Sequence, residues 1–172
     1  NTPRQSTDSG IPNGGSAFWA SSPNLTSPTA ADLVKIGGAA TELKVSQGWR
    51  FINIFFNNAS TTATTGCVGL YRGDGAGVDV GRDASHASFI NCYFTGANYG
   101  ILSQGGPSFV TVDNCTFFNF ASSGDTAIKA GTDTSVALPL QWEIKNCKFW
   151  NNTNHIVMPF SSANIHDNDF SF

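Results

Sequence analysis

The chain has 172 residues and a net charge of −3, and charged side chains make up only 12% of it. Nine Lys and Arg residues are too few for the basic surface that nucleic acid binding requires, and no apolar run is long enough for membrane insertion. Because 40% of the residues are hydrophobic, 14 residues are Phe and no heptad repeat occurs, we expect a packed core rather than a coiled coil or a disordered chain.

The first 30 residues are rich in Ser, Thr, Pro, Asn and Gly and contain one aromatic pair, Phe18-Trp19. This composition predicts an irregular N-terminal arm or cap over residues 1–30, followed by one domain over residues 31–172. Thr29–Asp32 resembles a helix start, although a loop into a strand at Leu33–Ile36 fits equally well. The chain begins with Asn rather than Met, which is typical of a processed chain or of a piece of a longer one.

A short motif recurs through the rest of the chain. The string Asn-Cys-x-Phe starts at Asn91, Asn114 and Asn146, and degenerate copies start at Asn53 and Asp167. The intervals between the copies are irregular but share a common minimum. This spacing predicts one coil of chain per repeat, with loops inserted into some of the coils.

Apolar and polar residues alternate around the Cys position of each copy, as in strands with one buried face. Apolar columns stand three residues before and two residues after that position: Phe51, Phe89, Val112, Ile144 and Ile165, then Phe56, Phe94, Phe117, Phe149 and Phe170. A further column joins Ile101 and Ile156 to Cys67 and Ile128. The buried side switches at the Asn, a residue that tolerates the left-handed backbone of a bend. We expect these Asn side chains to form a buried hydrogen-bonded ladder.

Stacked in register, such coils form an all-β parallel solenoid of about five to six coils behind the irregular arm. Cys92, Cys115 and Cys147 then lie above one another, about 4.8 Å apart between strands. We interpret them as a stack of buried thiols. A disulfide leaves one of the three unpaired, and a zinc site lacks the usual Cys spacing.

The segments Trp49–Phe56, Phe89–Phe94 and Tyr99–Ile101 resemble coils of right-handed parallel β-helices of the pectate-lyase-like superfamily. They look most like virion-associated β-helices such as phage tailspikes. The resemblance covers about residues 45–172 and implies a single-stranded, right-handed parallel β-helix. No catalytic signature of pectate lyases, rhamnogalacturonases or tailspike glycosidases matches residue by residue, so the resemblance leaves the activity open.

In the strand that precedes the Asn of each motif copy, the outward-facing positions hold ionisable residues in the copies nearer the C-terminus. The catalytic candidates there are Asp113, Glu143, Lys145 and His166. Asp113 and Glu143 lie on adjacent coils, where a glycosidase could use two carboxyl groups. Lys145 could instead stabilise the charge that develops in a lyase reaction. Ordinary ion pairs between neighbouring strands explain the same residues more simply.

Ile52 and Ile90 occupy the same outward column in earlier coils. We expect them to lie at a subunit interface or beneath a covering loop at Gly73–Gly81. That loop matches neither a phosphate-binding nor a calcium-binding motif.

Candidate ligand-binding residues are of two kinds. The densest charge in the chain lies in and beside the loop, at Asp74, Asp79 and Asp83, with Arg72 and Arg82. Aromatic residues outside the core could stack on sugar rings: Tyr71, Tyr93 and Trp150. We expect no metal and no cofactor, because the three His residues are too scattered for a metal site.

Two main functions follow. The first is a virion structural or tailspike-like receptor-binding β-helix, forming a homotrimer with other virion proteins as partners and displaying a rigid surface for host glycan attachment or assembly. It would act on the virion or outside the cell. The alternative is a polysaccharide-degrading hydrolase or lyase of the same fold. A third possibility is a secreted or cell-surface adhesin.

Overall fold

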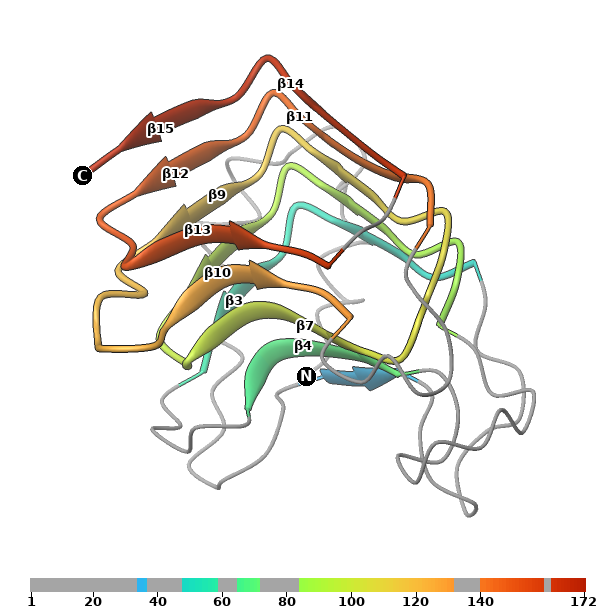
Figure 1. Ribbon diagram of the computed structural model, residues 1–172, viewed down its shortest axis with the longest axis horizontal. Helices are drawn as coiled ribbons and strands as arrows, with labels where there is room; N and C mark the ends of the chain where they lie inside the picture. Colours follow the sequence, from blue (N-terminus) through green and yellow to red (C-terminus); the bar gives the residue numbers. More distant parts are fainter. Residues whose placement is uncertain (1–33, 37–47, 59–64, 72–83, 132–139, 160–161) are drawn as a thin grey trace, which may run out of the picture.

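The computed structural model describes residues 34–36, 48–58, 65–71, 84–131, 140–159 and 162–172, and these residues form 15 short strands in three sheets. Successive strands along the chain enter different sheets, so each sheet collects every third strand (Figure 1). All of the strand pairs are parallel. This all-β architecture is consistent with the predicted parallel β-helix, or solenoid.

The three sheets are numbered here in the order in which the chain first enters them. Sheet 1 contains β1 (Val34–Ile36), β4 (Gly66–Tyr71), β7 (Tyr99–Gln104), β10 (Thr126–Lys129) and β13 (Asn154–Val157). Sheet 2 contains β2 (Arg50–Ile52), β5 (Ser88–Ile90), β8 (Thr111–Asp113), β11 (Trp142–Lys145) and β14 (Ala163–His166). Sheet 3 contains β3 (Phe55–Asn57), β6 (Tyr93–Thr95), β9 (Thr116–Phe118), β12 (Lys148–Trp150) and β15 (Asp169–Ser171).

The corner between sheets 2 and 3 is made by the residue that opens each motif copy. Asn53, Asn91, Asn114, Asn146 and Asp167 all have positive φ angles, between 52° and 58°. Asn and Asp are the residues, after Gly, that adopt this left-handed conformation most readily. The predicted bend is therefore confirmed.

The predicted burial of the Asn ladder is wrong. The Asn114 side chain donates a hydrogen bond to Asn91 Oδ1 at 2.7 Å, but Asn114 and Asn146 are both exposed. Asn146 bonds to Asp113 Oδ1 instead of continuing the row. Side chains at a convex left-handed corner point outward, and only Asn53 is buried.

The core is a column of rings with aliphatic residues packed beside it. Sheet 3 aligns the predicted Phe column in register, and the neighbouring ring centroids lie 4.6–5.1 Å apart: Phe56, Phe94, Phe117, Phe149 and Phe170. The Ile144 and Val112 positions align in sheet 2 as predicted. Such stacked parallel rings contribute both burial and direct ring–ring attraction.

Sheet 1 corrects one predicted alignment. Ile101 pairs with Ile128, and Ile128 pairs with Ile156, as expected. The partner of Ile101 on the other side is Val68 rather than Cys67. The connection between β3 and β4 therefore contains one residue more than the motif spacing suggested, and Cys67 is buried beside the column.

All four Cys residues are buried, and none of them forms a disulfide. Cys92, Cys115 and Cys147 follow the corner in successive coils, and the backbone N–H of Cys92 donates to Cys115 Sγ at 3.4 Å. Cys115 N–H donates in the same way to Cys147 Sγ at 3.4 Å. The predicted thiol stack is confirmed.

Several predicted features lie outside the described residues: the arm over residues 1–30, the helix start at Thr29–Asp32, the loop at Gly73–Gly81, and Asp74, Asp79 and Asp83. The strand predicted at Leu33–Ile36 is present as β1. Within the described part of the chain, no helix is long and apolar enough to cross a membrane.

Candidate functional site

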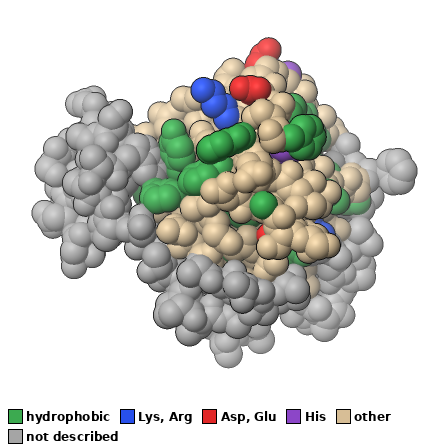
Figure 2. Space-filling model, turned by 90° about the vertical axis from the view of Figure 1, so that its left-hand side faces the viewer, with side chains coloured by type: hydrophobic (Ala, Val, Ile, Leu, Met, Phe, Trp, Pro, Cys, Tyr) green, Lys and Arg blue, Asp and Glu red, His purple; other side chains and the backbone are tan. Residues whose placement is uncertain are grey.

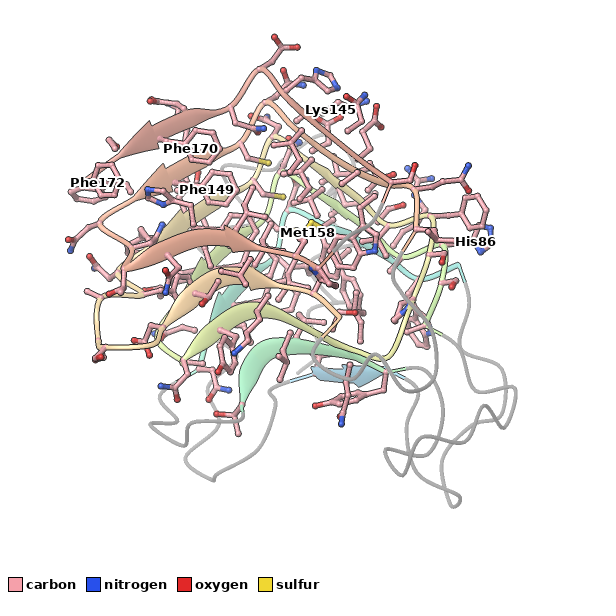
Figure 3. All side chains as sticks on the ribbon, in the orientation of Figure 1. His86, Lys145, Phe149, Met158, Phe170 and Phe172 are labelled. Atoms are coloured by element: carbon pink, nitrogen blue, oxygen red, sulfur yellow. The ribbon has the colours of Figure 1, made fainter. Side chains whose placement is uncertain are left out.

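The predicted catalytic residues lie on the outer face of sheet 2, on three neighbouring strands. Lys145 in β11 is aligned with Asp113 in β8 and with His166 in β14. Its Nζ donates a hydrogen bond to Glu143 Oε2 at 3.0 Å, between two side chains on one face of the same strand. Figure 3 shows Lys145 projecting away from the core at this face.

His166 lies on the other side of Glu143. Its Nε2 is 3.8 Å from Glu143 Oε1, and its Nδ1 is 2.7 Å from Asp167 Oδ2. Asp113 lies beside this group because β8 aligns it with Lys145. Its Oδ1 accepts a hydrogen bond from the Asn146 side chain at 2.9 Å instead. The structure therefore gathers all four candidates on one face, but it links only Glu143, Lys145 and His166 directly.

The chemistry of this group is that of a surface ion-pair network. The hydrogen bond to Glu143 raises the pKa of Lys145, because the carboxylate favours the charged ammonium. A lysine with a raised pKa stays protonated at neutral pH and cannot act as a base. Glu143 is partly exposed and already hydrogen-bonded to that lysine, and a partly exposed pair of this kind contributes little to stability.

The outer face of sheet 3 carries a row of aromatic side chains, which we call the aromatic stripe: Phe55, Tyr93, Phe118 and Trp150. Consecutive ring centroids lie 6.4, 6.4 and 6.5 Å apart. Tyr93 is 44% exposed and Trp150 is 56% exposed. Figure 2 looks onto the side where the strands of sheet 3 end and shows several hydrophobic side chains gathered on that face, beside polar surface.

Register explains how four different strands build this stripe. Phe55 is aligned with Tyr93, and Phe118 is aligned with Trp150, so the stripe changes from one outward row of sheet 3 to the other between β6 and β9. Tyr93 and Phe118 bridge the change with an edge-to-face contact. The stripe thus follows the stacking direction of the strands.

Tyr93 and Trp150 are among the aromatic candidates predicted from the sequence, whereas Phe55 and Phe118 are not. The signal was present, because both missed residues stand next to a buried Phe of the core column and must therefore point outward. Tyr71, the third aromatic candidate, ends β4 in sheet 1 and is not part of the stripe.

The two predicted interface residues are aligned on sheet 2. Ile52 in β2 pairs in register with Ile90 in β5, and Ile90 pairs with Asp113 in β8. Ile52 is exposed and Ile90 is half-buried. The two side chains therefore form a small apolar area beside the charged group.

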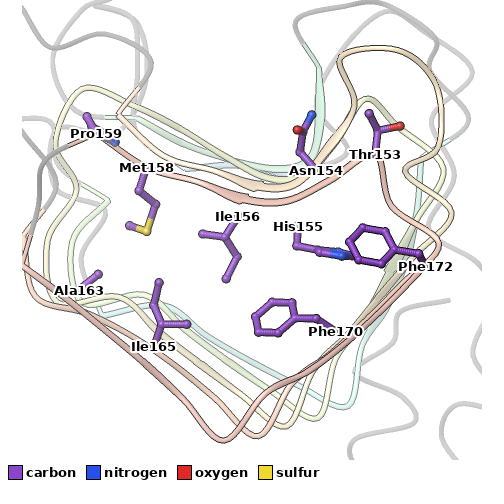
Figure 4. A pocket seen from close by; sticks show the side chains of 10 residues that line it. All are labelled: Thr153, Asn154, His155, Ile156, Met158, Pro159, Ala163, Ile165, Phe170 and Phe172. Atoms are coloured by element: carbon purple, nitrogen blue, oxygen red, sulfur yellow. The ribbon is translucent and has the colours of Figure 1, made fainter.

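A pocket of about 680 Å³ opens at the end of the solenoid formed by β13, β14 and β15 (Figure 4). The lining is mostly apolar: Ile156, Met158, Ile165, Phe170 and Phe172, with Thr153, Asn154, His155, Pro159 and Ala163. The described residues contain no group of three or more His, Cys, Asp or Glu side chains that could hold a metal ion. The pocket thus exposes two residues of the core columns, Ile165 and Phe170, beside the polar side chains of Thr153, Asn154 and His155.

Comparison of the chain with protein-family profiles, with curated proteins and with solved structures finds no match.

Proposed function

We propose that this chain is a tailspike-like, receptor-binding β-helix that attaches to a host glycan. The proposal includes a right-handed, single-stranded parallel β-helix of about five to six coils. It also includes a location on the virion or outside the cell. The observation that carries the proposal is the aromatic stripe.

A row of half-buried and exposed aromatic rings suits a polysaccharide. Sugar rings have an apolar C–H face that packs on an aromatic ring, while their hydroxyl groups remain in water. The stripe is built from four strands, so it can contact several sugars of one chain rather than a single sugar. The remaining surface is rich in uncharged polar groups, since charged residues are only 12% of the chain.

The core beneath the stripe supports binding by holding the rings in place. Each outward aromatic of β9 and β12 follows directly after a fully buried residue, Phe117 or Phe149. The buried rings stack with their planes only 5° from parallel. A rigid binding surface loses little conformational entropy when a ligand binds.

The trimeric, virion-assembled state is part of the same proposal. The aligned Ile52 and Ile90 on sheet 2 support it, because an exposed and a half-buried apolar residue in register are suited to a subunit interface. Sheet 3 would then remain open to the glycan.

The test begins with binding of the purified chain to an array of bacterial surface polysaccharides and common oligosaccharides. Hits are then measured by calorimetry with the Trp150→Ala and Phe118→Ala variants. We expect each variant to weaken binding by at least about tenfold. Phe109→Ala is the matched control, because Phe109 is similarly exposed but stacks on His86 away from sheet 3. Equal binding by all variants, or no glycan bound by the folded chain, would refute the proposal.

Polysaccharide hydrolysis or lysis is the second candidate. The observation in its favour is the meeting of Glu143, Lys145 and His166 on the exposed face of sheet 2. Incubation of each bound polysaccharide with the chain, followed by sizing of the products, tests it. We expect no cleavage, because the Glu143 carboxylate already accepts a hydrogen bond from Lys145. Cleavage that Glu143→Gln and Asp113→Asn abolish would establish the enzyme instead.

A further inference from the structure

The aromatic stripe is bordered on one side by a pair of exposed amide side chains. Asn119 follows Phe118 directly at the end of β9, and Asn151 follows Trp150 directly at the end of β12. Both Asn residues are exposed and have positive φ angles, 63° and 52°. They form the corner at which the chain leaves sheet 3, so the two amides lie beside two rings of the stripe.

The two amides are joined to each other and keep further hydrogen-bonding capacity. Asn151 Nδ2 donates a hydrogen bond to Asn119 Oδ1 at 2.8 Å. Within the described residues no other hydrogen bond involves either side chain, so Asn119 Nδ2 remains a donor and Asn151 Oδ1 remains an acceptor. Because the bond between them restrains both side chains, the pair offers a donor and an acceptor in a defined arrangement next to the rings.

This arrangement matches the hydroxyl groups of a sugar. A hydroxyl group both donates and accepts hydrogen bonds, whereas an ionised carboxylate only accepts them. A sugar whose C–H face packs on Phe118 or Trp150 places its hydroxyl groups around the edge of its own ring, within reach of an amide beside the aromatic ring. The ring and the amide that follows it in the chain can therefore contact the apolar and the polar parts of one sugar.

The charges on the outer face of sheet 3 do not favour an acidic sugar. Lys148 and Asp169 are the charged residues among the described strands of this sheet, and they are aligned in register on β12 and β15. The carboxylate of Asp169 would repel an anionic group that approached Lys148. An uncharged ligand meets no such repulsion.

We propose that the Asn119–Asn151 pair is the hydrogen-bonding part of the glycan site and selects an uncharged polysaccharide by its ring hydroxyl groups. This proposal rests on the proposed function, because it requires a glycan on the aromatic stripe. The stripe contacts the faces of the sugar rings, and the amide pair recognises the hydroxyl groups at their edges.

A glycine substitution tests the amide pair while keeping the corner. Gly adopts a positive φ readily, so Asn151→Gly removes the amide without straining the backbone. Asn146→Gly is the matched control. Asn146 lies just before β12, has a φ of 54°, is exposed and donates one side-chain hydrogen bond, but it stands at the opposite corner of sheet 3. Urea denaturation of both variants verifies that they fold with similar stability.

Calorimetry then measures binding to defined polysaccharides. The neutral probes are dextran, mannan and galactan, and the acidic probes are polygalacturonate and hyaluronan. Every bacterial surface polysaccharide that binds in the array is also measured. An O-methylated form of each bound polysaccharide keeps its sugar rings but loses hydroxyl donors, so it separates hydrogen bonding from stacking.

We expect an uncharged polysaccharide to bind and Asn151→Gly to weaken that binding by about fivefold or more, whereas Asn146→Gly should change it by less than about twofold. On the O-methylated form, the difference between the original chain and Asn151→Gly should shrink. A merely structural role of Asn151 would not produce this dependence on the hydroxyl groups.

Three results would overturn the proposal. If Trp150→Ala weakens binding but Asn151→Gly binds as well as Asn146→Gly, the amide pair is not part of the site, and the proposed function still stands. Preference for the acidic probes, lost in Lys148→Gln, would show that the site selects a charged glycan. Absence of binding to every polysaccharide would refute the proposed function, and the role of the amide pair with it.

Discussion

The rings of Phe117 and Phe149 stack with centroids 5.1 Å apart and planes 5° from parallel, and both are fully buried. They lie in the middle of the column that joins five strands of sheet 3. The column is continuous from β3 to β15, so loss of one central ring removes contacts on both of its sides.

We therefore expect Phe117→Ala to lower the free energy of unfolding by about 3–5 kcal/mol, because it removes a large buried side chain and leaves a cavity. Urea denaturation followed by circular dichroism measures the effect. Phe118→Ala is the matched control, since Phe118 is the next residue on β9 but points outward. Phe118→Ala should lower the free energy of unfolding by well below half as much as Phe117→Ala. Equal losses for the two variants would contradict a core column at this register.

The corner residue Asn114 gives a second prediction. Its φ of 52° favours Gly over any residue with an ordinary side chain, and its amide bonds to Asn91. We expect Asn114→Ala to destabilise the fold by about 1–2 kcal/mol, whereas Asn114→Gly costs less, because Gly relieves the backbone strain and loses only an exposed hydrogen bond. Urea denaturation of the two variants, measured side by side, compares their free energies of unfolding. The opposite order would show that the corner is not left-handed.

The thiol stack predicts a reactivity pattern. Burial raises the pKa of the Cys115 thiol well above its ordinary value, so its reactive thiolate is scarce at neutral pH. The hydrogen bond with Cys115 lowers the pKa of Cys147, but all four Cys side chains are buried away from a reagent in solution. We therefore expect the folded chain to react slowly with a thiol reagent such as Ellman's reagent, and the unfolded chain to react at four thiols, one for each Cys. Two equivalents in denaturant without a reductant would instead reveal a disulfide.

His155 predicts a pH dependence. Burial lowers its pKa in the folded state, so the unfolded state binds the proton more tightly. This residue's contribution to stability is complete above the unfolded pKa, about 6.5, and is lost as the pH falls below that value.

Thermal unfolding between pH 7.5 and about 5 measures the effect of His155. We expect the Tm of the original chain to fall more steeply than that of His155→Gln, in which the titrating group is gone. Parallel curves for the original chain and His155→Gln would contradict the prediction.

Much of the fold is readable from local pattern. The Phe column, the Asn bends and the Cys stack follow from residues that recur at fixed offsets from one motif, because each coil places the same offset at the same point of the cross-section. The Cys67 alignment failed where a connection separates β3 from β4, since the length of a connection does not determine which residue enters the next strand in register.

The candidate site could be predicted from the sequence less completely than the fold. The motif places Glu143 and Lys145 on one face, but their hydrogen bond depends on side-chain conformation and on neighbouring strands. The aromatic stripe depends on diagonal contact between Tyr93 and Phe118, which lie in different outward rows.

The sequence by itself determined which residues face the core, because burial along a strand alternates with a period of two that local order encodes. Only the tertiary structure decided which outward side chains meet and which end of the stack stays open. Those contacts join residues far apart in the chain, and their distances depend on how the coils stack rather than on the order of residues within any one coil.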